Sequence, residues 1–539
     1  MDLAAVVRKH TLKNAYDYGK ADPKGVVGKV VAELPEAKKD MKSTMSAVSE
    51  EVARVNALDK AEIGKELAGY SFEEKKEGPR EYRLPQAEQG KVVTRFLPEP
   101  NGYPHLGHAK AAFLSAEVAR FHGGTCLLRF DDTNPEAERQ EYVDAIKEGL
   151  QWLGLGFAGE LYASDRMPQL QQFGQKLLIL GRAYACTCPK EAVNANRFKG
   201  TACNCRERRG GENLALWNKM ASGGIGKGEG IIRLKADMKS ANTVMRDPTL
   251  FRVIEAPHYR QGDKYRVWPT YDFEVSIADS LDGVTHALRS KEYELRDELY
   301  YAILDAVSLP KPLVYDFSRL SIAGTALSKR ILRPLVESGK VPGWDDPRLP
   351  TLAGLRRRGI LPQAAKEFVL RQGLGKQENA PPFSDLLQIN RSLLDPVAPH
   401  HFFVEDPVKL AVGGRTFHVP RHDADSLKGG DEFRLKDLMT VRIESKSEGL
   451  LACSESAAEP KGMRKIQWVE EGKAVAAKAV FFSDLLDSEG NFNPASMRVA
   501  DGFAQKECAD LEQGAFVQFE RVGFFRLDDK AKMSFFSCG

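Results

Sequence analysis

The stretch Thr94–Lys110, TRFLPEPNGYPHLGHAK, is the most informative part of the sequence for the fold class. A short β-branched run at 91–96 precedes a loop of prolines and glycines at 98–108, and an amphipathic helical pattern follows at 109–121. The run CLLRFDD at 126–132 predicts the next strand, which completes one βαβ unit of a parallel, doubly wound α/β sheet. The loop therefore lies at the sheet edge where such folds bind ligands, and a helix N-terminus there favours an anion.

Two histidines in this loop are candidates for phosphate chemistry. His105 and His108 are separated by Leu106 and Gly107, so both can point into one small volume, and the glycine lets a base or ribose approach the backbone. Imidazoles at such a place can donate hydrogen bonds to phosphate oxygens as negative charge builds in a transition state. For an isolated HxGH, two surface histidines in a turn are the alternative.

A second element lies further along the chain. ALSKR at Ala326–Arg330 follows SRLSIAGT, and Lys329 is a compact cation suited to a departing pyrophosphate. Alone, this motif is commonplace in solvated turns. Together the two elements resemble the HIGH and KMSKS signatures of class I aminoacyl-tRNA synthetases. Leu106 replaces isoleucine in the first signature, and the altered outer positions of the second leave Lys329 as its main cation.

The resemblance to this class extends from about residue 90 to the end of the chain. The runs at 128–136, 244–252, 271–290 and 343–359 are similar to the glutamyl/glutaminyl branch, and residues 1–70 are similar to the helical extension of archaeal glutamyl-tRNA synthetases. It implies ATP-dependent ligation of L-glutamate to tRNA(Glu) through glutamyl-adenylate, with Mg²⁺ on the phosphates. Whether tRNA(Gln) is also charged with glutamate, as an amidation precursor, stays open.

The resemblance also implies residue roles. His105, His108 and Lys329 are the expected catalytic residues. The expected ATP-binding residues are Pro98, Glu99, Pro100, Asn101, Gly102, Gly107, Arg319, Leu320 and Ser328. The expected glutamate-binding residues are Arg95, Asp131, Tyr271 and Arg289.

Arg289 is the expected selector of glutamate. The matching position of glutaminyl members is small and uncharged, whereas a guanidinium suits a bidentate bond to the γ-carboxylate. The alternative is a surface ion pair of Arg289 with Glu292 or Glu294.

Three rival functions are a glutaminyl enzyme, a small-molecule nucleotidyltransferase and an inactive tRNA-binding scaffold. Arg289 argues against the first of these. The C-terminal β-strands and the insertion argue against the second, and the intact His105, His108 and Lys329 argue against the third.

Four cysteines form two tight pairs in one short region. Cys186 and Cys188 form CTC, and Cys203 and Cys205 form CNC. Four thiolates can supply the corners of a closed, structural zinc site. Disulfides and reduced, unliganded thiols are the alternatives. The basic residues around this cluster could meet the phosphates of the tRNA acceptor end.

Length and composition predict a multidomain globular protein. The chain has 539 residues, 42% hydrophobic and 28% charged, and its 78 basic and 75 acidic residues nearly cancel, so an anionic partner must meet local patches. No run is long and apolar enough for a membrane span, and the charged start MDLAAVVRKH disfavours export. We expect a cytoplasmic location and neither a membrane nor a DNA partner.

The expected domains follow the changes in pattern along the chain. They are a helical extension at 1–70, a linker at 71–90, a Rossmann-like catalytic domain at 91–164 and 270–325, an acceptor-binding insertion at 165–269, a helical subdomain with the KMSKS-like loop at 326–397, and antiparallel anticodon-binding β-barrels at 398–539.

Overall fold

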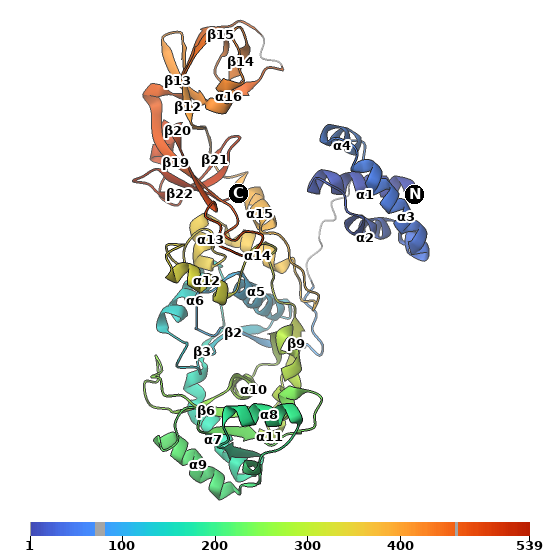
Figure 1. The fold of residues 1–539 in the computed structure, drawn as a ribbon, viewed down its shortest axis with the longest axis vertical. Coiled ribbons are helices and arrows are strands. Elements are labelled where there is room, and N and C mark those ends of the chain that lie inside the picture. Colours follow the sequence, from blue (N-terminus) through green and yellow to red (C-terminus); the bar gives the residue numbers. More distant parts are fainter. Residues whose placement is uncertain (1, 71–80, 459–461) are drawn as a thin grey trace. The chain divides into compact units, whose positions relative to one another are not determined.

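The computed structural model describes residues 2–70, 81–458 and 462–539 and divides between Glu81 and Tyr82 into two compact units. In the first unit an aspartate caps the N-terminus of each of four helices. Their apolar faces form a core of its own that includes Val6, Leu12, Val26 and Val48. The helices are α1 (Leu3–Tyr18), α2 (Pro23–Glu33), α3 (Met41–Val55) and α4 (Lys60–Leu67) (Figure 1).

The expected linker at 71–90 is described only in part, because residues 71–80 lie outside the described residues. Tyr82 and Leu84, in its second half, are buried in the same core as Phe113 and Val118. The ring of Tyr82 also meets Phe121 edge to face. This part of the segment thus packs on the second unit.

The predicted βαβ unit is confirmed. β1 (Val93–Phe96) and β2 (Thr125–Phe130) pair in parallel, and α5 (Leu106–Phe121) connects them. β3 (Glu160–Tyr162) adds to the far side of β2, and α6 (Gln140–Trp152) packs against apolar side chains of β1 and β2.

The later half of the catalytic domain continues this sheet on the other side of β1. β8 (His286–Ser290) and β9 (Leu313–Phe317) pair in parallel, and the Thr285 N–H donates to the Val93 carbonyl at 2.9 Å. β1 therefore lies between β2 and β8, the point at which the order of strands reverses and ligands bind in open α/β sheets. α10 (Tyr271–Leu281) and α11 (Asp297–Val307) precede these two strands.

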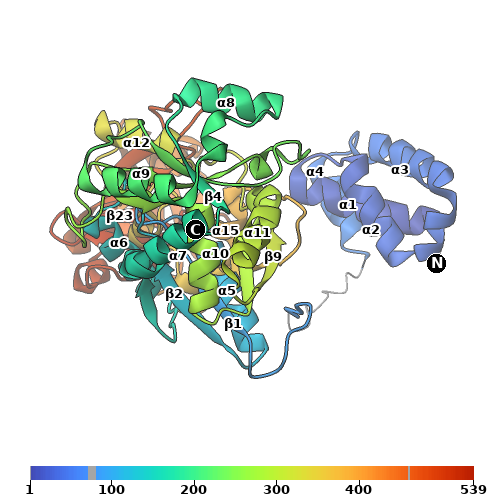
Figure 2. The same cartoon turned by 90° about the horizontal axis from the view of Figure 1, so that it is seen from below.

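The insertion is a mixed module with a four-stranded antiparallel sheet. Its core is mostly aliphatic and also contains the aromatic residues Trp217, Phe251 and Trp268. Figure 2 shows α8 and α9 on the outside of this module. Its elements are α7 (Met167–Ile179), β4 (Ala183–Cys186), α8 (Lys190–Lys199), α9 (Gly210–Ser222), β5 (Ile231–Leu234), β6 (Thr249–Val253) and β7 (Val267–Pro269).

Four helices follow the catalytic sheet. Phe368 and Val369 pack in the same core as Phe113 and Leu114 of α5. This shared core attaches the helical subdomain to α5, the helix that follows the nucleotide loop. The helices are α12 (Lys329–Glu337), α13 (Leu352–Arg358), α14 (Pro362–Leu370) and α15 (Phe383–Leu394). No described helix is long and apolar enough to span a membrane.

The C-terminal region contains two seven-stranded sheets that curve as barrels do (Figure 1). One consists of β12 (Pro407–Val412), β13 (Arg415–Pro420), β14 (Glu432–Leu435), β15 (Thr440–Ser447), β16 (Leu450–Glu455), β17 (Lys465–Ile466) and β18 (Val469–Glu470). The other consists of β10 (His400–His401), β11 (Phe403–Glu405), β19 (Ala474–Phe482), β20 (Met497–Gln505), β21 (Phe516–Phe519), β22 (Gly523–Asp529) and β23 (Ser534–Ser537). The short helix α16 (Arg421–Asp425) follows β13.

The expectation of purely antiparallel sheets is wrong. β10 pairs with β21, β12 with β16, β14 with β17 and β19 with β23 in parallel. Hairpins make only neighbouring strands antiparallel, whereas these partners are distant in the chain and meet after longer connections. The sheet of β12–β18 is also inserted between β11 and β19 of the other sheet.

Candidate active site

The two loop histidines sit at the start of α5 and face one another. His105 is the N-cap, and its Nδ1 accepts the Gly107 N–H at 3.0 Å. His108 Nδ1 accepts the His105 N–H at 3.2 Å, and the ring centroids are 4.1 Å apart. A neutral imidazole that accepts at Nδ1 carries its proton on Nε2. Both rings therefore offer an Nε2–H donor.

The surroundings keep both rings neutral. Burial, and then the charges of His108 and Arg319, lower the pKa of His105 well below its ordinary value. Burial, and then the charge of Lys329, lower the pKa of His108 to about 4. Gly107 is required here, because a Cβ at this position would lie 2.8 Å from His105 Cε1.

Lys329 bridges the two signature elements. It is the first residue of α12, and its Nζ donates to the Asn101 carbonyl at 2.5 Å and to Asn101 Oδ1 at 2.8 Å. Its stem crosses Gly102 so closely that a Cβ there would lie 2.9 Å from Lys329 Cδ. Burial lowers the pKa of Lys329, and the charge of Glu99 opposes this. The signature loop is thus held against the nucleotide loop.

A cavity of about 570 Å³ brings most of the expected site residues together. Those that line it are Arg95, Pro98, Glu99, Asn101, His105, Gly107, His108, Asp131, Tyr271, Arg289, Arg319 and Leu320. Lys329 and Gly102 do not line the cavity, but Lys329 donates to Asn101 of its wall and lies against Gly102. Neither Pro100 nor Ser328 lines it; Ser328 is the N-cap of α12.

Arg289 lines this cavity. Arg289 is only 4% exposed, and its Nη1 donates to Asp297 Oδ1 at 3.1 Å. The ring centroids of Tyr271, Tyr293 and Tyr300 lie 5.8, 5.3 and 5.5 Å from its guanidinium carbon. Its Nε is buried without a hydrogen-bond partner among the described residues. The alternative, a surface ion pair of Arg289 with Glu292 or Glu294, is not observed, because Glu292 pairs with Arg319 and Glu294 pairs with Lys376. A buried, unpaired donor of this kind suits an anionic ligand.

Arg95 lies on β1, and Asp131 directly follows β2. Burial, and then the charge of Glu99, raise the pKa of Asp131 to about 7, so a cationic ligand beside it would favour its ionised form. Arg95 donates to Asp279 Oδ1 at 2.9 Å and to the Leu288 carbonyl at 2.7 Å. Asp279 also accepts from Arg129 at 2.7 Å and therefore holds both guanidinium groups in place.

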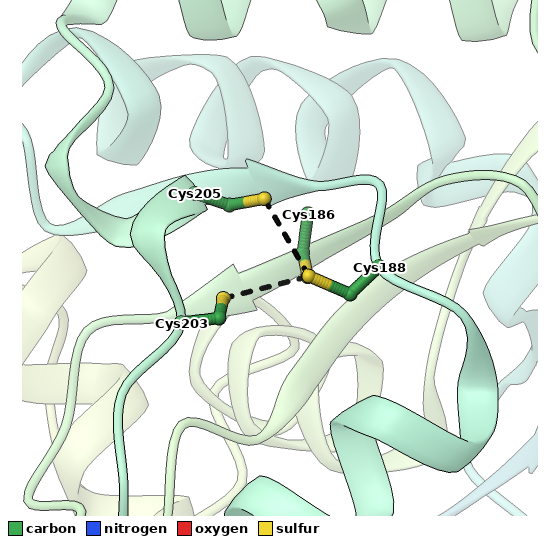
Figure 3. A group of neighbouring side chains, drawn as sticks. All are labelled: Cys186, Cys188, Cys203 and Cys205. Carbon is green, nitrogen blue, oxygen red and sulfur yellow. Dashed lines mark hydrogen bonds between the residues drawn. The ribbon is translucent and has the colours of Figure 1, made fainter.

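The four cysteines converge as the spacing predicted (Figure 3). Cys186 and Cys203 are 3.8 Å apart at sulfur, Cys188 and Cys205 are 3.7 Å apart, and all four sulfurs lie within 4.8 Å of one another. A tetrahedron with Zn–S bonds of about 2.3 Å has edges of about 3.8 Å. No disulfide joins any of the four. The donor set fits a closed zinc site.

Comparison with known proteins identifies the family. The model of the catalytic domain of class I tRNA synthetases (E and Q) matches residues 91–394, and the model of the anti-codon binding domain of the same group matches residues 465–528. The chain belongs to the class I tRNA synthetases for glutamate and glutamine. The match to the catalytic model spans the loop histidines, Lys329 and the cysteine module.

Relatives of this synthetase match over nearly its whole length. A glutamate–tRNA ligase of Cenarchaeum symbiosum (strain A) is 40% identical over 554 aligned positions, 98% of each chain. One of Nitrosopumilus maritimus (strain SCM1) is 42% identical over 562 positions, again 98% of each chain. One of Korarchaeum cryptofilum (strain OPF8) is 39% identical over 572 positions, 99% of each chain.

Three residues of the synthetase site were not assigned a role from the sequence. Lys110 is 1% exposed, donates to the Ser318 carbonyl at 2.6 Å, and its pKa is lowered to about 8 by burial. Asp297 orients Arg289, and Arg252 lines the cavity. Lys110 and Arg252 are the last residues of the runs 94–110 and 244–252 that resemble the family, whereas Asp297 belongs to no recognisable pattern.

Proposed function

We propose that this chain is an ATP-dependent glutamate–tRNA ligase. The α-carboxylate of L-glutamate attacks the α-phosphorus of ATP, pyrophosphate leaves, and a terminal ribose hydroxyl of tRNA(Glu) then attacks the carbonyl of glutamyl-adenylate. No side chain becomes a covalent nucleophile. The chain itself contributes positioning and stabilisation of charge.

The unpaired Nε of buried Arg289 is the observation that carries the choice of amino acid. The γ-carboxylate of glutamate would accept from this guanidinium. Glutamine would turn part of its amide, itself a donor, toward a donor-only cation and leave a buried N–H of Arg289 unsatisfied. Asp131, which lines the same cavity, would accept from the α-ammonium group.

The neutral imidazoles supply the phosphate side of the reaction. Nε2–H of His105 and of His108 would donate to phosphate oxygens as they gain charge, and Lys329 would follow the pyrophosphate. Magnesium prefers oxygen ligands and substrate phosphates, and Glu99, Asp131 and Glu138 offer carboxylates in the cavity wall. When bound, it would neutralise phosphate charge.

The tRNA surfaces follow from the domain order. We infer that the insertion at 165–269 takes the acceptor end and that the sheets at 398–539 take the anticodon, with the catalytic sheet between them (Figure 1). The proposal includes a structural zinc on Cys186, Cys188, Cys203 and Cys205, and a cytoplasmic location, where thiols stay reduced.

Parallel charging reactions test the proposed function. Labelled glutamate and labelled glutamine are each offered with ATP to purified tRNA(Glu) and tRNA(Gln), with tRNA present throughout because adenylation can depend on it. We expect glutamate on tRNA(Glu). Glutamate on tRNA(Gln) would extend the activity to the amidation precursor, and glutamine on either tRNA would contradict the proposal.

The variant Arg289→Cys tests the pocket. We expect kcat/KM for glutamate to fall about 100-fold, in the range for loss of a charge-assisted bond, with KM for tRNA unchanged. Arg333→Cys, which removes an exposed arginine of α12, is the matched control. An unchanged preference for glutamate in Arg289→Cys would refute the assignment of this residue.

A further inference from the structure

Arg358 is a buried cation in the helical subdomain. It is the last residue of α13 and is 6% exposed. Its side chain makes no hydrogen bond or ion pair within the described ranges 2–70, 81–458 and 462–539, and its Nε is fully buried. Burial lowers the pKa of Arg358 to about 10, so the guanidinium is still charged at neutral pH. A buried charge of this kind favours an anionic ligand.

The groups around Arg358 leave its charge uncompensated. Burial raises the pKa of the neighbouring Cys538 thiol to about 12, so this thiol is neutral. Asp484 is exposed, and no ion pair joins it to Arg358 in the described part of the chain. The ring centroids of Phe383 and Phe482 lie 5.1 and 5.3 Å from the guanidinium carbon. Aromatic faces attract a cation, but they leave its N–H groups without acceptors.

Arg358 lines a cavity of about 230 Å³. This cavity shares no lining residue with the catalytic one. Its walls are mainly apolar and include Leu332, Phe383, Leu387, Phe482, Leu485 and Leu486. An apolar cavity of about 150 Å³ in a protein core can hold a benzene ring. There is therefore room here for a ring or short chain with a carboxylate attached.

Three segments meet at this cavity, and one is the loop that precedes Lys329. Residues 323–326 of this loop line it, together with the start of α15 and the segment 482–486 at the end of β19. The Ala323 N–H donates to the Pro381 carbonyl at 3.1 Å. A Cβ on Gly324 would lie 3.8 Å from Asp484 Oδ2. A ligand in the cavity would therefore contact the loop from the side opposite neither segment can leave freely.

We propose that this cavity binds a compact monocarboxylate with an apolar body. The carboxylate accepts from the guanidinium of Arg358, and the apolar body packs between Phe383, Phe482 and the leucines. The bound ligand restrains residues 323–326 and through them the loop that carries Lys329. This inference goes beyond the proposed function, because binding requires neither ATP nor tRNA.

Calorimetric titration of the full chain tests the site with benzoate as the probe. Benzyl alcohol has the same ring without the charge, and inorganic phosphate has the charge without the ring. We expect each to bind about tenfold more weakly than benzoate or worse, because the alcohol lacks the charge-assisted hydrogen bond and phosphate buries no apolar surface. Benzoate should also slow hydrogen exchange of the backbone amides at 323–326.

A matched pair of variants at the rim of the cavity controls for folding. Ser384 is exposed, lines the cavity and is the second residue of α15, where a carboxylate suits the helix N-terminus. Ser384→Asp should weaken benzoate about tenfold by repelling its carboxylate, whereas Ser384→Asn, of the same shape, should not. Arg358→Met keeps an apolar stem, and it should abolish the preference for benzoate over benzyl alcohol.

Three results would overturn the proposal. Equal affinity for benzoate and benzyl alcohol would show that Arg358 binds no anion, and equal affinity for benzoate and phosphate would show that the apolar walls are not used. Loss of benzoate binding in Arg289→Cys, but not in Ser384→Asp, would place the probe in the catalytic cavity. Unchanged hydrogen exchange at 323–326 would refute the restraint of the loop. Normal charging without benzoate binding would refute this site alone.

Discussion

At the scale of single residues, the two loop histidines illustrate how hydrogen bonding selects a tautomer. Each Nδ1 accepts a backbone N–H, so neither ring needs a second side chain to orient it. A neutral donor gains strength as charge develops on the phosphate, and it does not bind the ground state as a fixed cation would. Low pKa values of the histidines are therefore part of the proposed chemistry.

The depressed pKa of His108 predicts loss of stability in mild acid. The pKa is about 4 in the folded chain, below the ordinary value of 6.5, so the unfolded chain binds the extra proton first as pH falls. The full stability is present above about pH 6.5 and declines as pH falls toward 4. Near pH 5 we expect a loss of about 2 kcal/mol from this group.

Thermal and urea unfolding of the full chain at pH 7.5 and pH 5 measure this loss. His108→Gln should reduce the difference in stability between the two pH values, whereas His422→Gln, at an exposed histidine of the short helix α16, should not. An identical pH dependence in wild type and His108→Gln would show that His108 is not buried as a neutral group.

At the scale of elements, the structure separates local patterns from non-local ones. The β1–α5–β2 unit was predictable because strand, loop and helix each have a periodicity within a few residues. The parallel pairing of β10 with β21 was not, because it depends on how distant segments pass one another. The same holds for the site. His105 and Lys329 belong to short motifs, whereas Asp297 is recognisable only because the fold places it beside Arg289.

The cysteine module predicts a metal-dependent element. We expect about one zinc per chain after dialysis, and none in Cys203→Ser. Removal of zinc by a chelator should destabilise the insertion by about 3 kcal/mol or more, the value for a ligand held at one hundred times its dissociation constant. Metal analysis and thermal melting measure both effects.

Cys453→Ser serves as the control for the zinc experiment, because this cysteine lies in β16, outside the cluster. A wild-type chain that is folded, free of zinc and insensitive to chelator would contradict the metal site. In that case the four cysteines would be reduced thiols that only pack against one another.

At the scale of the whole molecule, the chain has separate cores in its two units. Val48 is fully buried within the first unit, together with Val6 and Val26. The second unit contains the catalytic sheet, the helical subdomain and the C-terminal sheets. Asn390 of the helical subdomain, for example, donates to the carbonyl of Gly359 at 3.0 Å and to that of Cys538, at the end of the C-terminal sheets, at 2.7 Å. The units should therefore unfold separately.

Calorimetry of the full chain tests this separation. We expect a distinct transition for residues 1–70, which Val48→Asp should abolish, because an unpaired charge in this core costs about 4 kcal/mol or more. The remaining transitions should be unchanged. Ser49→Asp, at the adjacent exposed position of α3, should leave all of them in place. Loss of every transition in Val48→Asp would mean that the cores are coupled.

The insertion of one C-terminal sheet within the other has a consequence for synthesis on the ribosome. His400 of β10 pairs with Gln518, and Phe403 of β11 pairs with Ala504, so both strands are synthesised long before their partners. The strands β12–β18 are completed in the meantime. At about 5–20 residues per second, this delay is on the order of ten seconds. During that time β10 and β11 have unsatisfied edges, and a nascent chain in this state is the form most in need of a chaperone.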